Sequence, residues 1–225
     1  MTLSHRVARW LLLFGALIAL GSPATAQNPP GFADEIRAFA EADALQMPAK
    51  GGILFVGSSS IRMWEGLAQD FPGLPVLNRG FGGSTIAESI HYADRIILPY
   101  APRTIVFYAG DNDIAGGRSA EQVLGDFQTL VGFVHAWLPR TRILYIAIKP
   151  SIARWSMVGE IRKANALIEA YTRTSDRLGF IDIFPAMLGA DGKPRADLLR
   201  EDGLHMTRAG YVIWRDAVRR ALGER

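Results

Sequence analysis

The sequence has 225 residues and contains no cysteine. That absence excludes a disulfide framework, a thiol nucleophile, thiolate metal sites and a lipid-modified N-terminal cysteine. A chain without cross-links must draw its stability from a hydrophobic core, and a chain of this length can build one. We therefore expect a single domain that folds around its own core.

The sequence also lacks an apolar run that could span a bilayer. The run over residues 10–20 is well short of the roughly 20 residues that a membrane helix needs, which argues against a retained anchor. Basic residues precede this run, and the small residues Ala24-Thr25-Ala26 follow it. That is the order of a secretory signal peptide over residues 1–26. We expect an exported protein, periplasmic or secreted, with no stable membrane anchor after cleavage.

Little net charge remains after such a cleavage. The whole sequence has 25 Lys+Arg against 22 Asp+Glu; Arg6 and Arg9 leave with residues 1–26 and no acid does, so 23 basic residues remain against 22 acidic ones. A near-neutral domain gives no electrostatic reason to expect a nucleic-acid partner. The basic pI of the full chain is therefore not taken as a binding surface.

After a linker and helix over residues 27–50, short apolar runs alternate with longer segments of helical periodicity. The apolar runs are rich in β-branched and aromatic residues and show little alternation, which is typical of strands buried on both faces of a parallel sheet. They cover residues 53–56, 75–77, 104–109, 143–148 and 180–183. The helical segments cover residues 32–45, 84–98, 120–138, 155–178 and 207–222.

Because parallel neighbours need crossover helices, this alternation predicts an α/β fold over residues 51–225. The expected architecture is a three-layer α/β/α sandwich with a mainly parallel five-stranded sheet and short connections. In such sheets the chemistry gathers at the carboxyl ends of the strands. The residues just after each apolar run are therefore the candidates for a site.

A turn of small residues, Gly57-Ser58-Ser59-Ser60, follows the first run. It can raise a hydroxyl above the sheet, and the free N–H groups of a helix that begins there favour developing negative charge. A serine-rich turn is also a common helix N-cap, so this segment alone does not define a nucleophile. It is not the G-x-S-x-G elbow, because Ile61 replaces the second glycine, and it is not a Walker loop.

Polar turns also follow the second and third runs. They read Asn78-Arg79-Gly80-Phe81-Gly82-Gly83-Ser84-Thr85 and Gly110-Asp111-Asn112-Asp113. The glycines of the first turn let the backbone approach a ligand, although an ordinary capped turn has the same composition. The second turn places three polar side chains at one strand end, which fits either a site or a turn.

Histidine narrows the search. His91 and His135 fall inside helical segments, where surface or packing roles are expected. His205 follows Asp202 by three residues just before the last helix, so the two side chains can lie on the same side of one turn. That arrangement fixes the tautomer of a general base and stabilises its imidazolium. The alternative is a turn aspartate beside a surface histidine.

Taken together in this order, the four segments resemble the sequence blocks of SGNH hydrolases, also called GDSL-type esterases. The likeness runs from Ile53 to Tyr211, nearly the whole chain after the expected signal peptide. Each block is weak alone, but four in sequence at strand ends form a specific pattern. The resemblance implies the flavodoxin-like SGNH hydrolase fold and ester hydrolysis without a metal or cofactor.

Carried over position by position, the resemblance makes Ser59 the nucleophile, His205 the general base and Asp202 its orienting carboxylate. It also implies an oxyanion hole formed by the N–H groups of Ser59 and Gly83 and by the side-chain amide of Asn112. This chemistry is coherent, because a serine hydroxyl needs a positioned base and an ester carbonyl needs donors for its oxyanion.

One position departs from the family pattern. Ser58 stands where the family name expects the aspartate of Gly-Asp-Ser. That aspartate is not a triad member, so the mechanism is unaffected. The change does make the choice among Ser58, Ser59 and Ser60 depend on alignment.

The substrate stays open at this point. The resemblance allows short-chain carboxyl esters, O-acetylated sugars or cell-wall polysaccharides, and lysophospholipids or thioesters. Asp111, Arg154 and Trp155 are candidate substrate-binding residues, although Trp155 suits packing in the core as well as stacking on a sugar. Since the expected rim is small and polar and no long apolar insertion is present, we expect acetyl to butyryl esters of a small-molecule or carbohydrate alcohol.

Two readings outside ester hydrolysis are also compatible with parts of the sequence. The serine-rich first turn could cradle a phosphate, as in flavodoxin-like flavin-binding proteins. A non-catalytic envelope binding module could keep the same fold. The second reading is disfavoured because every expected catalytic position is filled.

Overall fold

The computed structural model describes residues 31–223, so the expected signal peptide lies outside the described residues. Five strands form one sheet in the order β2-β1-β3-β4-β5, and every neighbouring pair is parallel. The strands are β1 (Ile53–Gly57), β2 (Val76–Gly80), β3 (Thr104–Tyr108), β4 (Arg142–Ile146) and β5 (Leu178–Ile181). The predicted α/β class and parallel sheet are confirmed.

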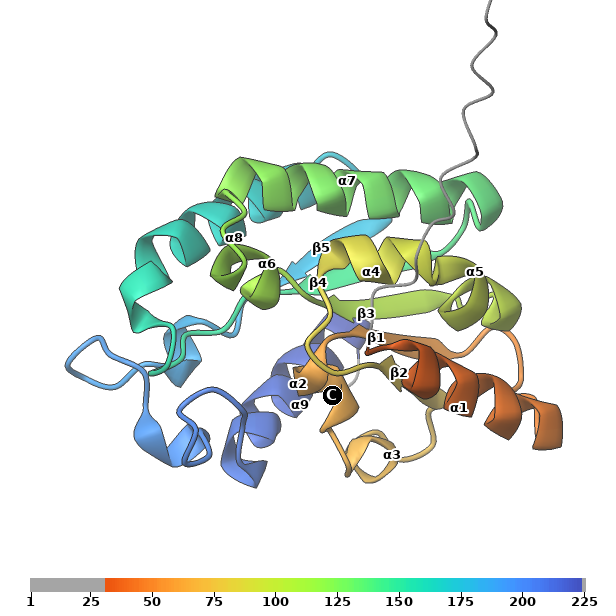
Figure 1. The fold of residues 1–225 in the computed structure, drawn as a ribbon, viewed down its shortest axis with the longest axis horizontal. Coiled ribbons are helices and arrows are strands. Elements are labelled where there is room, and N and C mark those ends of the chain that lie inside the picture. Colours follow the sequence, from red (N-terminus) through yellow and green to blue (C-terminus); the bar gives the residue numbers. More distant parts are fainter. Residues whose placement is uncertain (1–30, 224–225) are drawn as a thin grey trace, which may run out of the picture.

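Helices cover both faces of the sheet, as the predicted three layers require (Figure 1). One face packs against α4 (Ile86–His91), α5 (Ala93–Ile96), α7 (Ala120–Trp137) and α8 (Val158–Thr172), with α1 (Ala33–Leu45) beside α5. The other face packs against α2 (Ser59–Arg62), α3 (Leu67–Asp70) and α9 (Arg208–Leu222), and α6 (Asp111–Ala115) follows β3. None of the helices within residues 31–223 is long and apolar enough to cross a bilayer.

Alternate strand residues supply two hydrophobic clusters, one on each face. Leu54 and Phe107 pack under the α7 layer, whereas Phe55 and Val106 pack under the α9 layer. All four side chains are at most 1% exposed. Strands buried on both faces explain why the apolar runs show no alternation in the sequence.

Strand β2 is longer than predicted. It continues through Asn78 and Gly80, which the sequence analysis assigned to the following turn. Asn78 Nδ2 donates to the carbonyl of Ile61 at 2.7 Å, and its Oδ1 accepts from the N–H of Gly80 at 2.8 Å. A Cβ on Gly80 would lie 2.4 Å from the backbone nitrogen of Arg62, so the close approach of α2 requires glycine here. Polar residues can occupy β2 because it is an edge strand.

Two predicted helices are also wrong in extent. The segment over residues 84–98 is divided into α4, α5 and a 3₁₀ turn η1 (Leu98–Tyr100). The segment over residues 155–178 begins as the 3₁₀ turn η2 (Trp155–Met157) and ends as α8 at Thr172, and Leu178 belongs to β5. Gly179, a poor strand former, hides the start of β5 in the sequence.

One connection is long, contrary to the expectation of short ones. Residues 182–207 join β5 to α9 and contain the 3₁₀ turns η3 (Pro185–Met187) and η4 (Ala196–Leu198). Leu198 is 2% exposed and packs in the α9 cluster, so this connection is built into the core. It ends in the turn that carries Asp202 and His205.

Candidate active site

Ser59 begins α2 directly above the carboxyl end of β1. The preceding Gly57 has φ of 147°, and a Cβ there would lie 1.9 Å from the carbonyl oxygen of Tyr108, so only glycine permits this turn. Ser58 and Ser60 are buried, with 2% and 3% exposure, whereas Ser59 is partly exposed. Of the three serines, Ser59 is therefore the one whose hydroxyl a substrate can reach.

The structure brings Ser59, His205 and Asp202 into one hydrogen-bonded line. His205 Nε2 lies 2.9 Å from Ser59 Oγ, and His205 Nδ1 lies 2.6 Å from Asp202 Oδ2. The other carboxylate oxygen of Asp202 accepts the N–H groups of Leu204 and His205, both at 2.9 Å. Gly203, with φ of 63°, makes the tight turn that folds the carboxylate back on the imidazole.

These hydrogen bonds also set the charge of the carboxylate. The bond from His205, followed by the backbone N–H of Leu204, lowers the pKa of Asp202 to about 2. Asp202 is thus an anion at neutral pH. An anionic partner on Nδ1 keeps the proton there, which leaves Nε2 free to accept the proton of Ser59.

Gly83 and Asn112 lie together across the turn that follows β2. Asn112 Nδ2 donates to the carbonyl of Ser84 at 3.0 Å, which uses one of the two amide hydrogens. No hydrogen bond of the N–H groups of Ser59 and Gly83 is found among residues 31–223. These two N–H groups and the second hydrogen of Asn112 are the donors that could receive an oxyanion.

A buried ionic network orients the Asn112 amide. Arg154 Nη2 donates a hydrogen bond to Asn112 Oδ1 at 2.8 Å. Arg154 Nη1 forms an ion pair with Asp111 Oδ1 at 2.6 Å, but the angle between the two groups does not suit a hydrogen bond. Asp111 Oδ2 accepts from Lys149 Nζ at 2.9 Å. Because Arg154 only donates, it must face the oxygen of Asn112, so the amide nitrogen is turned toward Ser84.

Asp111 holds this network together as a buried anion. Burial raises the pKa of its carboxyl, but the nearby charges of Lys149 and Arg154 outweigh burial and keep the pKa below its usual value. Asp111 is 4% exposed and therefore lies behind Asn112, where it has little surface for a substrate. Trp155, the third expected substrate residue, is half-buried in η2, and the Arg162 guanidinium lies 5.9 Å from its ring centre.

Two residues of the site have no role assigned from the sequence, which indicates only that the segment starting at Lys149 could border the site. Lys149 is 1% exposed, and the signal that could have revealed it is a lysine that directly follows an apolar run. Glu35 on α1 accepts the N–H of Gly82 at 2.6 Å and the guanidinium of Arg62 at 2.6 Å. One glutamate in a helix carries no sequence signal, yet it ties α1 to the helix of Ser59 and to the glycine before Gly83.

Asp113, next to this network, has the opposite electrostatics. Its carboxylate accepts the N–H of Ile86 at 3.0 Å and that of Gly110 at 2.9 Å, which joins α4 to the start of α6. Burial dominates over these hydrogen bonds and raises the pKa of Asp113 to about 6. Within residues 31–223 no cation forms an ion pair with Asp113, and its hydrogen bonds fix the backbone of α4 and α6.

The hydrogen-bonded line of serine, histidine and aspartate at the carboxyl ends of the strands has the arrangement that serine hydrolysis requires. Residues 54–213 match the model of the GDSL-like Lipase/Acylhydrolase family, and the chain belongs to that family. The resemblance to GDSL-type hydrolases drawn from the four sequence blocks is thereby confirmed.

Named relatives in this family are acetylhydrolase subunits. The chain is 27% identical over 169 residues to the platelet-activating factor acetylhydrolase IB subunit alpha1 of Bos taurus, which covers 71% of this chain and 70% of that protein. The alpha2 subunit of Rattus norvegicus is 26% identical over the same length, with 71% of each chain covered.

Solved structures share the fold. A GDSL-like lipase from Bacteroides thetaiotaomicron superposes with a TM-score of 0.70 at 20% identity, covering 84% of this chain and 97% of that one. A catalytic mutant of an acetylxylan esterase from Geobacillus stearothermophilus superposes with a TM-score of 0.63 at 15% identity, covering 79% and 96%. At these identities the likeness concerns the fold.

Proposed function

We propose that this protein is an exported serine esterase that removes short acyl groups, acetyl above all, through Ser59, His205 and Asp202. The observation that carries the proposal is the contact between His205 Nε2 and Ser59 Oγ at 2.9 Å, with Asp202 on the other ring nitrogen. That distance lies within the reach a general base requires. Export rests on the signal-like segment over residues 1–26.

In the proposed reaction, Ser59 Oγ attacks the ester carbonyl carbon while His205 Nε2 takes its proton. The carbonyl oxygen becomes an oxyanion held by the N–H groups of Ser59 and Gly83 and by the Asn112 amide. The tetrahedral intermediate then collapses, and His205 returns the proton to the departing alkoxide. Water, deprotonated by His205, attacks the acyl-serine and releases the acid, which regenerates Ser59.

The surroundings of Ser59 favour a small acyl group. Trp64 and Phe81, the large apolar side chains closest in sequence to the site turns, are 1% and 0% exposed because they pack in the core, so neither can line an acyl channel. The residues at the rim are instead Gly82, Gly83 and Asn112. Ile152, which is 49% exposed beside Gly203, adds some apolar surface at this rim, so we expect added methylenes to gain only a small part of the ~0.8 kcal/mol that each would contribute on full burial.

The names of several similar proteins support the same acyl group. The platelet-activating factor relatives are acetylhydrolases, and the structural neighbours include an acetyl esterase and an acetylxylan esterase. These names share the acetyl group and differ in the molecule that carries it, which is platelet-activating factor in one case and xylan in the other. We therefore assign the acetyl group to this chain more firmly than the alcohol, for which an acetylated sugar suits the polar rim.

The test is a series of p-nitrophenyl esters from acetate to decanoate, followed by acetylated xylan and an acetylated glycerophospholipid. We expect kcat/KM to be highest for acetate to butyrate and acetate release from the polysaccharide to exceed release from the lipid. A rise that continues from butyrate through decanoate would contradict the short-acyl proposal. Ser59→Ala serves as the control, because hydrolysis that survives in it arises elsewhere.

A further inference from the structure

The end of the sheet opposite Ser59 carries a basic residue at the start of four strands. Lys50 precedes β1, Arg103 precedes β3, Arg142 begins β4 and Arg177 precedes β5. Because all strands are parallel, these positions share one edge of the sheet. Arg140, in the turn before β4, adds a fifth cation, and all five residues are exposed. We call these five residues the amino edge.

The charges of the amino edge are not neutralised by the fold. Arg103, Arg142 and Arg177 donate only to backbone carbonyl groups, and within residues 31–223 no ion pair is found for any of the five cations. Asp176 is the acid in these strand-start segments, and it too has no ion pair within that range. Elsewhere, surface arginines such as Arg173 and Arg195 have a carboxylate partner. Other basic side chains, among them Arg95, Lys193 and Arg200, also have no ion pair within residues 31–223, but the five of the amino edge lie together at one end of the sheet.

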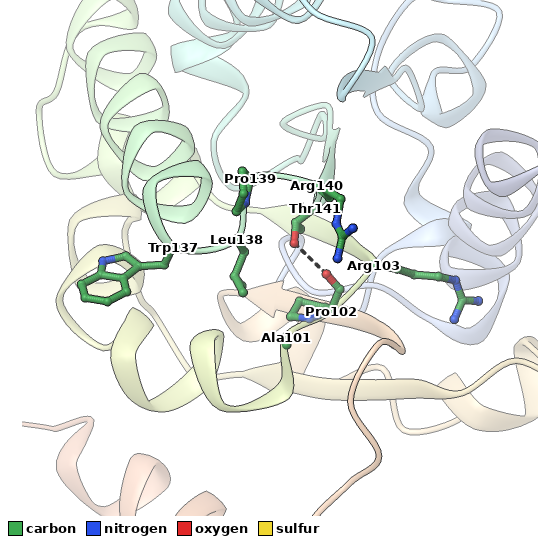
Figure 2. A pocket seen from close by; sticks show the side chains of 8 residues that line it. All are labelled: Ala101, Pro102, Arg103, Trp137, Leu138, Pro139, Arg140 and Thr141. Atoms are coloured by element: carbon green, nitrogen blue, oxygen red, sulfur yellow. Dashed lines mark hydrogen bonds between the residues drawn. The ribbon is translucent and has the colours of Figure 1, made fainter.

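An apolar cavity opens between these cations. Its volume is about 600 Å³, and both Arg103 and Arg140 contribute to its lining. In Figure 2, Pro102 and Leu138 lie below Arg140, and the Arg103 side chain points away from them. Trp137, the last residue of α7, stands at the side of this cavity with 66% of its surface exposed. Membrane interfaces favour an exposed tryptophan that lies close to arginines without a carboxylate partner.

The apolar surface continues to the end of α1. A second cavity of about 210 Å³ is lined by Pro48 and Ala49 and shares Pro102 with the first. Beside it, Leu45 is 91% exposed and Met47 is 48% exposed. In Figure 1 the carboxyl ends of α1 and α7 lie on the same side of the molecule as the start of β3. Cations and exposed apolar side chains thus occur on one side.

We propose that the amino edge docks the protein reversibly on the surface of an anionic lipid bilayer. The cations attract acidic headgroups, while Trp137, Leu45 and Met47 enter the boundary between headgroups and acyl chains. An acidic polysaccharide would satisfy the arginines as well, but it offers no apolar phase to receive Leu45 and Met47.

The inference is tested by cosedimentation with vesicles of phosphatidylglycerol and phosphatidylcholine, compared with vesicles of phosphatidylcholine alone. The protein used in this experiment begins at Gln27, because the apolar run over residues 10–20 would bind lipid by itself. We expect this shorter protein to fold, because residues 31–223 contain both hydrophobic clusters. We expect binding to the anionic vesicles that weakens as salt rises through the physiological range. Neutral vesicles should bind far less.

Substitutions locate the surface. The double variant Arg103→Gln and Arg140→Gln should lower the partition coefficient about 25-fold, since each cation near an anionic surface strengthens binding about fivefold. Trp137→Ala should lower it severalfold at any salt concentration. Lys193→Gln removes one positive charge from an exposed loop near the other end of the sheet and should change nothing. The thermal midpoint of each variant shows that it is folded.

Three results would overturn the proposal. The first is no binding to anionic vesicles at low salt, and the second is binding that persists in the double variant and in Trp137→Ala. The third is binding to polygalacturonate without binding to vesicles, which would assign the edge to an acidic polymer. Each of these readouts is independent of ester hydrolysis, so the docking surface and the proposed function can fail separately.

Discussion

Within residues 31–223, the charged side chains of the site around Ser59 are paired at the carboxyl ends of the strands, whereas those of the amino edge are unpaired. At the carboxyl ends of the strands, the charged groups of the site are paired: Asp202 pairs with His205, and Asp111 with Lys149 and Arg154. At the amino edge, five exposed cations have no carboxylate partner among the residues described. Paired charges hold atoms in fixed places, which a catalytic site requires, whereas exposed cations without a carboxylate partner remain available to an outside anion.

The largest difference in activity between variants at the two ends of the sheet is expected for Ser59 and its base, His205. Ser59→Ala and His205→Ala should each lower kcat/KM by about 10⁴-fold or more, and the double variant should lose little beyond either one, because groups that act as a unit are strongly non-additive. The measurement is p-nitrophenyl acetate hydrolysis. Arg140→Gln, at the other edge, is the matched control and should keep full activity. Losses that add in the double variant would mean that the two residues do not share a mechanism.

Removing the side-chain donor should have the next largest effect. Asn112→Ala should lower kcat about 10²- to 10³-fold with little change in KM, because an oxyanion donor binds the transition state more strongly than the ground state. Steady-state kinetics with a short-chain ester separate the two constants. A change confined to KM would place Asn112 in substrate binding instead.

Arg154 tests whether the buried network acts through Asn112. Arg154→Ala removes a charge-assisted hydrogen bond from the Asn112 amide, so we expect kcat to fall about tenfold. Combined with Asn112→Ala, the loss should not increase. Arg154 was also a candidate for substrate binding, and a rise in KM at constant kcat would support that role. Arg118→Ala, which breaks a surface pair with Asp126, is the control.

The smallest effect concerns stability and pH. The pKa of Asp113 is raised to about 6 in the fold, so the native state keeps a proton that the unfolded chain releases near its ordinary value of 3.8. Its contribution to the free energy of unfolding is therefore highest below about pH 4 and falls as the pH rises through 6. Urea unfolding of the protein and of Asp113→Asn should show a difference that declines across this window. A difference independent of pH would contradict the assignment.

The contribution of Asp202 to the free energy of unfolding changes with pH in the opposite direction. Because its pKa is lowered to about 2, its contribution is present above its ordinary value and is lost as the pH falls toward 2. The two aspartates lie at the same edge of the sheet and differ in their surroundings. One faces an imidazole at the surface, and the other is buried against backbone N–H groups.

The position of the site could be predicted because it depends on topology. In a parallel sheet all strands end at one edge, so Ser59 and His205 converge although 146 positions separate them in the chain. The choice of Ser59 over its neighbours could not be predicted from composition. It depends on burial, since the turn directs Ser58 and Ser60 into the protein.

The ionic supports of the site could not be read from the sequence. Glu35 and Gly82 are 47 positions apart, and nothing in either segment indicates that they meet. The clustering of the five cations of the amino edge could not be read from the sequence either. A total of basic and acidic residues contains no information on where the charges lie, and the parallel topology collects the strand-start cations on one side.

The length of the strands fixes how far the chemistry stands from a docked membrane. Strands β1 and β3 each contain five residues, which at about 3.3 Å per residue separate the two edges by roughly 16 Å. With the amino edge on the headgroups, the sheet becomes a spacer that lifts Ser59 by at least this height. At that height the ester bonds of the bilayer lie out of reach. The enzyme would instead work on acetylated chains that extend away from the lipid surface.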